Sequence, residues 1–378
     1  MIEFLLLIIT IFLTIASYAW SDYGFISLIT QTKPIFSKLY TLRGLMLYNR
    51  HIAEFLFVTL IISLVSIQIY FLFTKKEKIN LKTIIISLTI LFFAYPFLSS
   101  DIFSYLFAGK IAYVYHLNPY KTIPEAFREK DIWLSFTYWT HRNYIYGPLY
   151  LLISIIPLVI LGAEKFLTVF YLTKIISGLV FILTGLVIYR ITKDIKKAIY
   201  LWWVNPLVII ELLINSHNDL FMIFFFLLSI LLWDNKKRFW AIFSFISSVL
   251  TKYASAPFII LLFTKGKTRE ILSKVLLLLL LLFLGFKYPS FQAWYYTWIY
   301  FLIPLANLKK RSLLIIFLFQ GLLILDKYYT FISSGNWGPI NQDIRILFIF
   351  LPFITSLTLI RRRIKANSQK MAELDNHS

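Results

Sequence analysis

The sequence predicts an all-α integral membrane protein with about 12 transmembrane helices and an outer loop that carries juxtamembrane helices. Three observations lead to this fold class. Of the 378 residues, 59% are hydrophobic and only 15% are charged, which leaves too little polar surface for a soluble protein. Long apolar runs recur along the chain, and in lipid only a helix satisfies the backbone of such a run. The 38 lysines and arginines, set against 18 acidic residues, gather between these runs.

The apolar runs define the predicted spans in chain order. The first run resembles a signal peptide in length, but it lacks a basic start and a small-residue cleavage site, so we interpret it as a helix. Several later runs are short, and we expect them to pack inside a bundle around a polar cavity. Asn205 and Pro206 interrupt one span and are expected to kink it. The predicted spans are residues 2–20, 52–73, 81–98, 166–189, 198–214, 220–233, 239–251, 253–263, 270–286, 293–308, 312–325 and 342–360.

Residues 148–162 form a further apolar run that is not predicted to cross the membrane. The run is short and contains Pro148 and Pro157, which suits a re-entrant or interfacial helix. If it does not cross, the basic clusters between the spans fall on one side of the membrane, as the positive-inside rule expects. The chain is therefore predicted to be a multi-pass protein of the cell membrane with both termini cytoplasmic.

The chain is predicted to form one transmembrane domain over residues 1–360, in which residues 99–165 make the long outer loop. Residues 361–378 are basic and then polar, and are expected to form a cytoplasmic tail attracted to anionic lipid. The net charge of +20 belongs to the loops and not to a soluble basic face, so no nucleic-acid partner is predicted. With no cysteine, no HxxxH pattern and no Gly-rich phosphate loop, neither a metal nor a cofactor is predicted.

The outer loop begins with an acidic residue at the membrane boundary. Asp101 follows two serines and opens a helical pattern that runs to about residue 115. Ser104, Tyr105 and Ala108 share one face of that helix with it. Asp101 is then either a simple N-terminal cap, favoured by the helix dipole, or a general base held at the level of the lipid headgroups.

A second polar cluster lies in a tight outer turn at residues 215–219. A plain turn needs only one or two such side chains. The alternative is that His217, Asn218 and Asp219 line the same outer cavity as Asp101.

Further charges lie close to or within predicted spans, where ionisable residues usually face a cavity or a partner. Glu211 is one of them. Lys252 lies between two short spans and either snorkels to the headgroups or binds a phosphate at the membrane rim. Arg142 either clamps phosphate or is a surface residue. The aromatic residues at 294–298 fit an interfacial belt, with sugar stacking as the alternative.

These motifs together resemble the GT-C superfamily of polytopic glycosyltransferases, over roughly residues 81–305. The closest likeness is to the polyprenyl-phosphate-mannose-dependent alpha-mannosyltransferases of bacteria and archaea. The motifs that carry it, in chain order, are Ser99-Ser100-Asp101, Tyr105, Gly109-Lys110, Asn118-Pro119-Tyr120, Tyr146-Gly147-Pro148-Leu149, Asn205-Pro206, His217-Asn218-Asp219 and Lys252.

The resemblance implies a GT-C-like fold and transfer of a hexose, expected to be mannose, from a polyprenyl-phosphate donor to a glycan or glycolipid acceptor at the outer face. It implies that Asp101 is the catalytic base and that Lys252 lies near the donor phosphate. Residues 1–80 look like an N-terminal extension, because in many members the acidic loop follows the first span. The substrate-binding residues expected on this basis are Tyr105, Lys110, Arg142, Tyr146, His217, Asn218, Asp219 and Lys252.

The expected reaction is a single displacement that inverts the anomeric configuration, with Asp101 accepting the proton of the acceptor hydroxyl. Lys252, with Arg142 or Lys110, would stabilise the departing polyprenyl phosphate. Two alternatives remain. The first is a flippase or transporter that moves lipid-linked sugars without forming a new glycosidic bond. The second is a ligase or polymerase-like enzyme that moves whole glycans.

Overall fold

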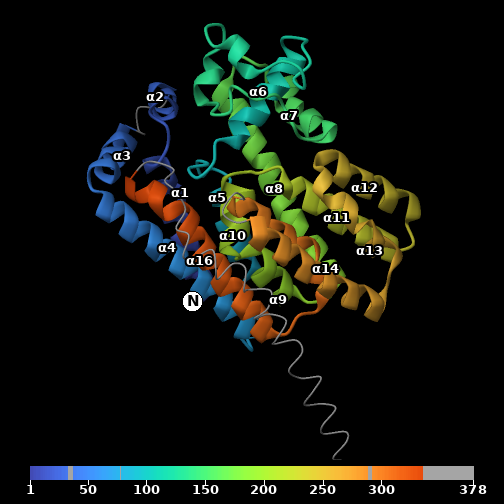
Figure 1. The fold of residues 1–378 in the computed structure, drawn as a ribbon. Coiled ribbons are helices and arrows are strands. Elements are labelled where there is room, and N and C mark those ends of the chain that lie inside the picture. The colour runs from blue at the N-terminus through green and yellow to red at the C-terminus, as the bar shows by residue number, and fades with distance from the viewer. Residues whose placement is uncertain (33–36, 77, 288–291, 335–378) are drawn as a thin grey trace, which may run out of the picture.

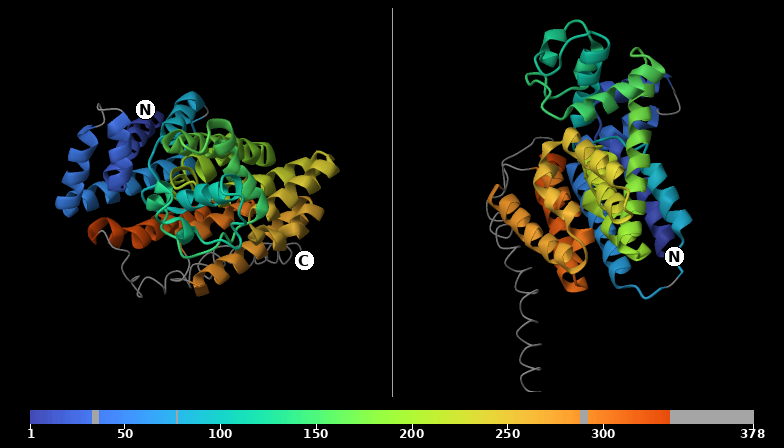
Figure 2. Two further views of the ribbon diagram at one scale, coloured as in Figure 1. Left: turned by 90° about the horizontal axis from the view of Figure 1, so that it is seen from above. Right: turned by 90° about the vertical axis from the view of Figure 1, so that its right-hand side faces the viewer.

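A computed structural model describes residues 1–32, 37–76, 78–287 and 292–334 of the chain. These residues form helices and the turns between them, with no strand in any of the described ranges. The helix Arg50–Phe73 packs along the helix Lys310–Ser334, and the helix Phe166–Thr192 packs on the helix Asp219–Asp234 (Figure 1; Figure 2 gives two further views). The α-helices are α1 (Ile2–Ala19), α2 (Tyr23–Thr32), α3 (Lys38–Tyr48), α4 (Arg50–Phe73), α5 (Leu81–Leu91), α6 (Asp101–Tyr113), α7 (Pro148–Leu161), α8 (Phe166–Thr192), α9 (Ile195–Ala198), α10 (Pro206–Val208), α11 (Asp219–Asp234), α12 (Arg238–Thr251), α13 (Ile260–Phe263), α14 (Gly266–Lys287), α15 (Ile303–Ala306) and α16 (Lys310–Ser334).

Shorter helical segments of other types connect these elements. Two of them are π-helical: η4 follows α9, and η5 follows α10. The segments are η2 (Pro124–Phe127), η3 (Ile132–Phe136), η4 (Ile199–Trp203), η5 (Ile209–Ile214), η6 (Tyr253–Ile259) and η7 (Ala293–Phe301).

The all-helical prediction is confirmed for the described residues. Four helices, α1, α4, α8 and α16, are long and apolar enough to cross a membrane, and a bent pair around Pro206 makes a possible fifth span. The predicted span 270–286 lies in α14, which has 22 residues but is not among these apolar helices, and the other described spans correspond to shorter helical segments. The count of twelve therefore stays a prediction. The predicted span 342–360 and the tail 361–378 lie outside the described residues.

Two segments differ from the sequence-based prediction. The predicted span 81–98 is helical only as far as Leu91, because the chain then turns through residues 92–100 towards α6. Residues 21–51, which connect the first two predicted spans, contain two helices, α2 and α3.

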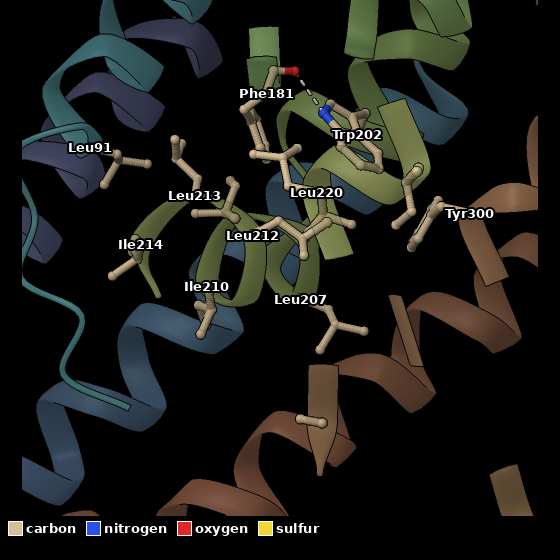
Figure 3. Close-up of a cluster of buried hydrophobic side chains, with 14 of the residues drawn as sticks. Leu91, Phe181, Trp202, Leu207, Ile210, Leu212, Leu213, Ile214, Leu220 and Tyr300 are labelled. Carbon is tan, nitrogen blue, oxygen red and sulfur yellow. Dashed lines mark hydrogen bonds between the residues drawn. The ribbon is translucent and has the colours of Figure 1, made fainter. Parts of the chain in front are cut away.

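The predicted kink at Asn205-Pro206 is present, because the two halves of this segment meet at 54°. The side chain of Asn205 accepts a hydrogen bond from the backbone nitrogen of Val208 at 3.1 Å and caps the second half. Residues 198–214 are buried, and Figure 3 shows Ile210, Leu212 and Leu213 among the side chains of this hydrophobic cluster. There the indole nitrogen of Trp202 donates to the carbonyl of Phe181 at 2.9 Å, which ties the segment to α8.

Helices α6 and α7 and the segment between them lie together at one end of the molecule, and α9 lies at the other (Figure 1). We call the first the α6 end. Helix α7 starts at Pro148, which suits the first turn of a helix, and stops before Gly162, whose φ of 82° favours glycine. It packs on α6 and α12. The short length of α7 is compatible with the predicted non-crossing helix, which stays a prediction.

Candidate functional site

Asp101 is the first residue of α6, and its carboxylate is turned into the protein. The residue is 5% exposed. The indole nitrogen of Trp139 donates to Oδ1 at 3.0 Å, and the hydroxyl of Tyr105, one turn further along α6, donates to Oδ2 at 3.4 Å. Ser100, and not Asp101, occupies the N-cap position of α6, and both carboxylate oxygens of Asp101 accept hydrogen bonds from side chains, so Asp101 is not a simple cap.

His217 lies between two carboxylates. Its Nδ1 atom is 3.5 Å from Oδ2 of Asp101, and its Nε2 atom is 3.4 Å from Oε2 of Glu211. Neither ring nitrogen has hydrogen-bond geometry, so these contacts are close charge pairs. The ring also stacks on Trp294, with centroids 4.4 Å apart. This arrangement fixes the imidazole from three sides.

The two carboxylates decide the charge of the histidine. Complete burial on its own lowers the pKa of His217, but Asp101 and Glu211 outweigh burial and raise this pKa to about 9. Burial on its own raises the pKa of Asp101, yet His217, the Trp139 indole and the charge of Lys252 together hold it below its usual value. At neutral pH the site therefore contains an imidazolium beside an ionised Asp101.

Glu211 is itself fixed by two neighbours. The side-chain nitrogen of Asn215 donates to Oε2 at 3.2 Å, and the hydroxyl of Tyr328 on α16 donates to Oε1. Within the described residues, no group of three or more histidine and acidic side chains is arranged to hold a metal ion.

A lysine from a predicted span holds the turn that carries His217. Lys174 of α8 is completely buried, and its ammonium donates to the carbonyl oxygens of Leu213, at 2.7 Å, and Ile214, and to the hydroxyl of Ser216, at 3.1 Å. Ser216 has a φ of 56°, which non-glycine residues adopt only with support. Lys174 was not singled out in the sequence, although a lone lysine inside an apolar run is a signal of function or of buried pairing.

Asp219 and Lys252 form the second charged pair of the site. The ammonium of Lys252 lies 2.9 Å from both carboxylate oxygens of Asp219, and the Trp298 indole also donates to Asp219. The rings of Tyr146, Tyr295 and Trp298 surround this ammonium at 5.3 to 5.5 Å, within the range of cation–π attraction. Lys252 therefore forms an ion pair and is surrounded by aromatic rings, rather than snorkelling to the headgroups.

Asn218 is completely buried beside this pair. Its side-chain nitrogen and oxygen have no hydrogen-bond partner in the described part of the chain. An amide buried without partners costs stability unless a ligand or water satisfies it. This fits the prediction that Asn218 contacts substrate, which stays a prediction.

Two predicted site residues, Lys110 and Arg142, make no direct contact with Asp101 in the described part of the chain. Lys110 follows it by nine positions on α6, and at about 100° per residue the two side chains leave opposite faces. Lys110 instead pairs with Asp131 at 2.6 Å and lies 4.2 Å above the Trp133 ring. Arg142 is exposed, with its guanidinium 4.4 Å above the ring of Trp139.

Two cavities meet at Asp101. The larger, about 660 Å³, extends from it towards the ends of α1, α3, α4 and α16. The smaller, about 150 Å³, is lined by Tyr105, Tyr146, Arg142 and their neighbours. Asp101, Trp139 and Trp294 line both cavities and so form the wall between them. The sequence had not singled out Trp139, and it had favoured a membrane belt for Trp294.

The arrangement brings together most of the residues that the sequence selected. Asp101, Tyr105, Tyr146, His217, Asn218, Asp219 and Lys252 form one buried polar and aromatic cluster. An ionised carboxylate between two cavities can accept a proton from a group in either cavity.

Comparison with known proteins identifies the family of the chain. No curated protein and no solved structure matches the chain. One family model does match, described as "Alpha-(1->6)-mannopyranosyltransferase, N-terminal domain", over residues 10–265. The match covers more than half of the chain and includes Asp101, the turn at 215–219 and Lys252. The chain therefore belongs to the alpha-(1->6)-mannopyranosyltransferase family, as the GT-C-like order of its motifs predicted.

Proposed function

We propose that this membrane protein transfers mannose from a polyprenyl-phosphate donor to a hydroxyl group of a glycan or glycolipid acceptor. The family supports mannosyl transfer, and the apolar helices favour a donor that is dissolved in the bilayer. The observation that carries the proposal is the placement of Asp101, an ionised and buried carboxylate in the wall between two cavities.

The proposed reaction is one displacement at the anomeric carbon. The acceptor oxygen forms a bond to this carbon while the bond from carbon to the phosphate oxygen breaks. The leaving polyprenyl phosphate keeps the electron pair of the broken bond. The proton of the acceptor hydroxyl moves to the carboxylate of Asp101. Attack from the face opposite the phosphate inverts the anomeric configuration.

The lowered pKa of Asp101 agrees with a late proton transfer. A weak base removes the proton only when bond formation has already made the acceptor oxygen acidic. Glycosyl transfer passes through a transition state with positive charge on the sugar ring. An ionised carboxylate next to that ring stabilises this charge as well.

His217 and Glu211 would act through Asp101. A charged imidazole 3.5 Å away keeps the carboxylate ionised, and Glu211 keeps the imidazole charged. Tyr105 and Trp139 restrict the rotation of the carboxylate by donating to its two oxygens. We expect these residues to position the base rather than to contact the reacting atoms.

The α6 end is proposed to face outward. The basic clusters between the predicted spans put the opposite end in the cytoplasm, with both termini there, by the positive-inside rule. Glu3, near the N-terminus, pairs with Lys76 in the turn after α4 at 2.7 Å, which ties these two segments to the same end. Cysteine placed at exposed positions of an otherwise cysteine-free chain, such as Ser135 or Lys75, would report the orientation by labelling with an impermeant reagent in intact cells.

The test of the proposed function is a transfer assay with the purified full-length protein in lipid vesicles. Radiolabelled polyprenyl-phosphate mannose is supplied with glycolipid extracts, and in parallel a nucleotide-activated mannose replaces the lipid donor. We expect labelled product only from the lipid donor, with the opposite anomeric configuration. Transfer from the nucleotide donor alone would overturn the donor assignment. Movement of labelled lipid across the vesicle membrane without a new glycosidic bond would point to a flippase instead.

A further inference from the structure

The N-terminal extension forms one side of the larger cavity that leads to Asp101. The end of α1, the helix α3 and the start of α4 all contribute to its wall. The opposite side comes from residues 95–101 and 135–139, and α16 closes it with Phe331. Residues 1–80, whose role the motifs leave open, therefore belong to the architecture of the site.

The size of this cavity suits a substrate. Small-molecule sites usually occupy about 300–1,000 Å³. The larger cavity, with about 660 Å³, falls within this range, whereas the smaller one, with about 150 Å³, admits only part of a ligand. The larger cavity is thus the better place for the bulkier substrate component near Asp101.

The extension brings two arginines to the wall of this cavity. Nε of Arg43 donates to the backbone carbonyl of Ser21 at 3.1 Å, and a terminal nitrogen of Arg50 donates to the carbonyl of Ile332 at 3.4 Å. These contacts hold each guanidinium in place and leave further N–H groups for a ligand.

Among the described residues, neither arginine forms an ion pair with a carboxylate. The acidic residue nearest to them in sequence on this wall, Asp22, accepts a hydrogen bond from the backbone of Gly24 at 2.7 Å instead. Asp22 and Asp101 also line this cavity, but neither pairs with Arg43 or Arg50 in the described part of the chain, so both half-buried guanidinium groups can still bind an anionic ligand. Arginine is the cation best suited to phosphate, because its planar N–H groups match the phosphate oxygens.

The other cations near Asp101 are less suited to this task. Lys252 already has its charge balanced by Asp219, whose two oxygens both lie 2.9 Å away. Lys110 is paired with Asp131. Arg142 has no carboxylate partner among the residues that the structure describes, but it lies on the smaller cavity and is stacked on Trp139.

We propose that Arg43 and Arg50 bind the phosphate of the lipid-linked donor in the larger cavity, so that the N-terminal extension is part of the donor site. The assignment rests on the proposed donor class. The sugar then reaches Asp101 from the larger cavity, and the acceptor hydroxyl approaches from the smaller one across the wall of Trp139 and Trp294.

The test compares the binding of polyprenyl phosphate with that of the matching polyprenol, which lacks the phosphate. The full-length protein is placed in phosphatidylcholine vesicles, and affinities are measured for the wild type and for Arg43→Gln, Arg50→Gln and the double variant. We expect each substitution to weaken phosphate binding about tenfold, the loss that goes with one charge-assisted hydrogen bond, and to leave polyprenol binding unchanged. The KM for polyprenyl-phosphate mannose rises in the same proportion, while kcat changes less.

Matched variants distinguish the effect of losing the positive charge from an effect on folding. Arg43→Lys and Arg50→Lys keep the positive charge and are expected to retain most of the phosphate affinity. Lys38→Gln removes an exposed cation from the same helix as Arg43, away from the cavity wall, and is expected to bind and react like the wild type. If the double variant does not fold, the single variants decide the question.

Three results would overturn the proposal. The first is unchanged discrimination between phosphate and alcohol in the glutamine variants. The second is loss of that discrimination in Lys252→Met alone. The third is competition by phosphatidylglycerol as effective as that by polyprenyl phosphate, which would make the arginines a site for bilayer headgroups. If the wild type binds polyprenyl phosphate through both arginines but transfers no mannose, the proposed function fails while the phosphate site stands.

Discussion

The imidazole of His217 lies with Nδ1 3.5 Å from the carboxylate of Asp101, although 116 positions separate the two residues in the chain. The second ring nitrogen faces Glu211 at 3.4 Å, so one positive charge is shared by two buried acids. Asp101 needs this charge, because an ionised carboxylate in a buried site is costly without a partner of opposite charge. The predictions below follow from this cluster and from the packing that supports it.

Replacing the proposed base should abolish transfer without unfolding the protein. Asp101→Asn keeps the shape of the side chain and the acceptor for the Trp139 indole, but it cannot take up a proton. We expect kcat to fall by about 10²–10⁴-fold, the usual contribution of a positioned base. Initial rates of mannose transfer at saturating donor measure this. Unchanged affinity for polyprenyl phosphate serves as the control, and a rate close to that of the wild type would show that Asp101 is not the base.

Alkaline pH should weaken the cluster through His217. Its pKa lies at about 9 in the folded protein, against 6.5 for the free side chain. Because the folded value is the higher one, the stabilisation is fully present below pH 6.5 and is lost as the pH rises through 9. Thermal unfolding between pH 6 and 10 should show this decline in the wild type, by about 2 °C or more. In His217→Gln that part of the decline should be missing. Identical pH profiles for both proteins would contradict a charged histidine.

The buried lysine beneath the turn should matter for activity as well as for stability. Lys174→Met leaves the carbonyls of Leu213 and Ile214 without their donor, which costs about 1–3 kcal/mol. The turn that carries His217 then loses its support, so we expect a lower kcat together with a lower melting temperature. Lys165→Met, which removes an exposed lysine before the same helix, is the matched control and should behave like the wild type. A stable, fully active Lys174→Met protein would show that the turn at 215–219 keeps its conformation without Lys174.

Gly147 should tolerate no side chain. A Cβ atom at this position would lie 1.9 Å from the carbonyl oxygen of Leu250, which is rigid backbone at the end of α12. We expect Gly147→Ala to destabilise the protein by about 1–3 kcal/mol, as overpacking usually does, and to displace the adjacent Tyr146 from Lys252. Gly44→Ala is the control, because a Cβ atom there meets nothing within 4 Å. Thermal unfolding compares the two, and equal stabilities would disprove the close approach.

Short-range patterns in the sequence accounted for much of the fold. Apolar runs located most of the helices, because a helix of that composition is favoured by lipid whatever it packs against. The proline after Asn205 predicted the bend, since a proline removes a backbone hydrogen bond from any helix. The start of α6 at Asp101 followed from the helical spacing of the residues after it.

The sequence also predicted which residues form the site, but it did not predict which charged residues contact one another. The motifs around Asp101, His217 and Lys252 predicted a family that the comparison confirmed. They did not predict that Lys252 forms an ion pair with Asp219. This pair balances the positive charge that Lys252 was expected to offer to a phosphate. They also placed Lys110 in the site, although helical geometry puts it on the opposite face of α6.

By itself, the sequence determined an apolar helical protein, its family, and the residues that carry polar chemistry, because these depend on composition and on spacing along a single helix. Only the tertiary structure decided which charges face one another. His217 meets Asp101 and Glu211, Trp139 and Trp294 divide two cavities, and the extension brings Arg43 and Arg50 to one of them. The physical reason is that the pairing of distant side chains depends on how helices pack, and an apolar helix can pack in many ways that its own sequence does not distinguish.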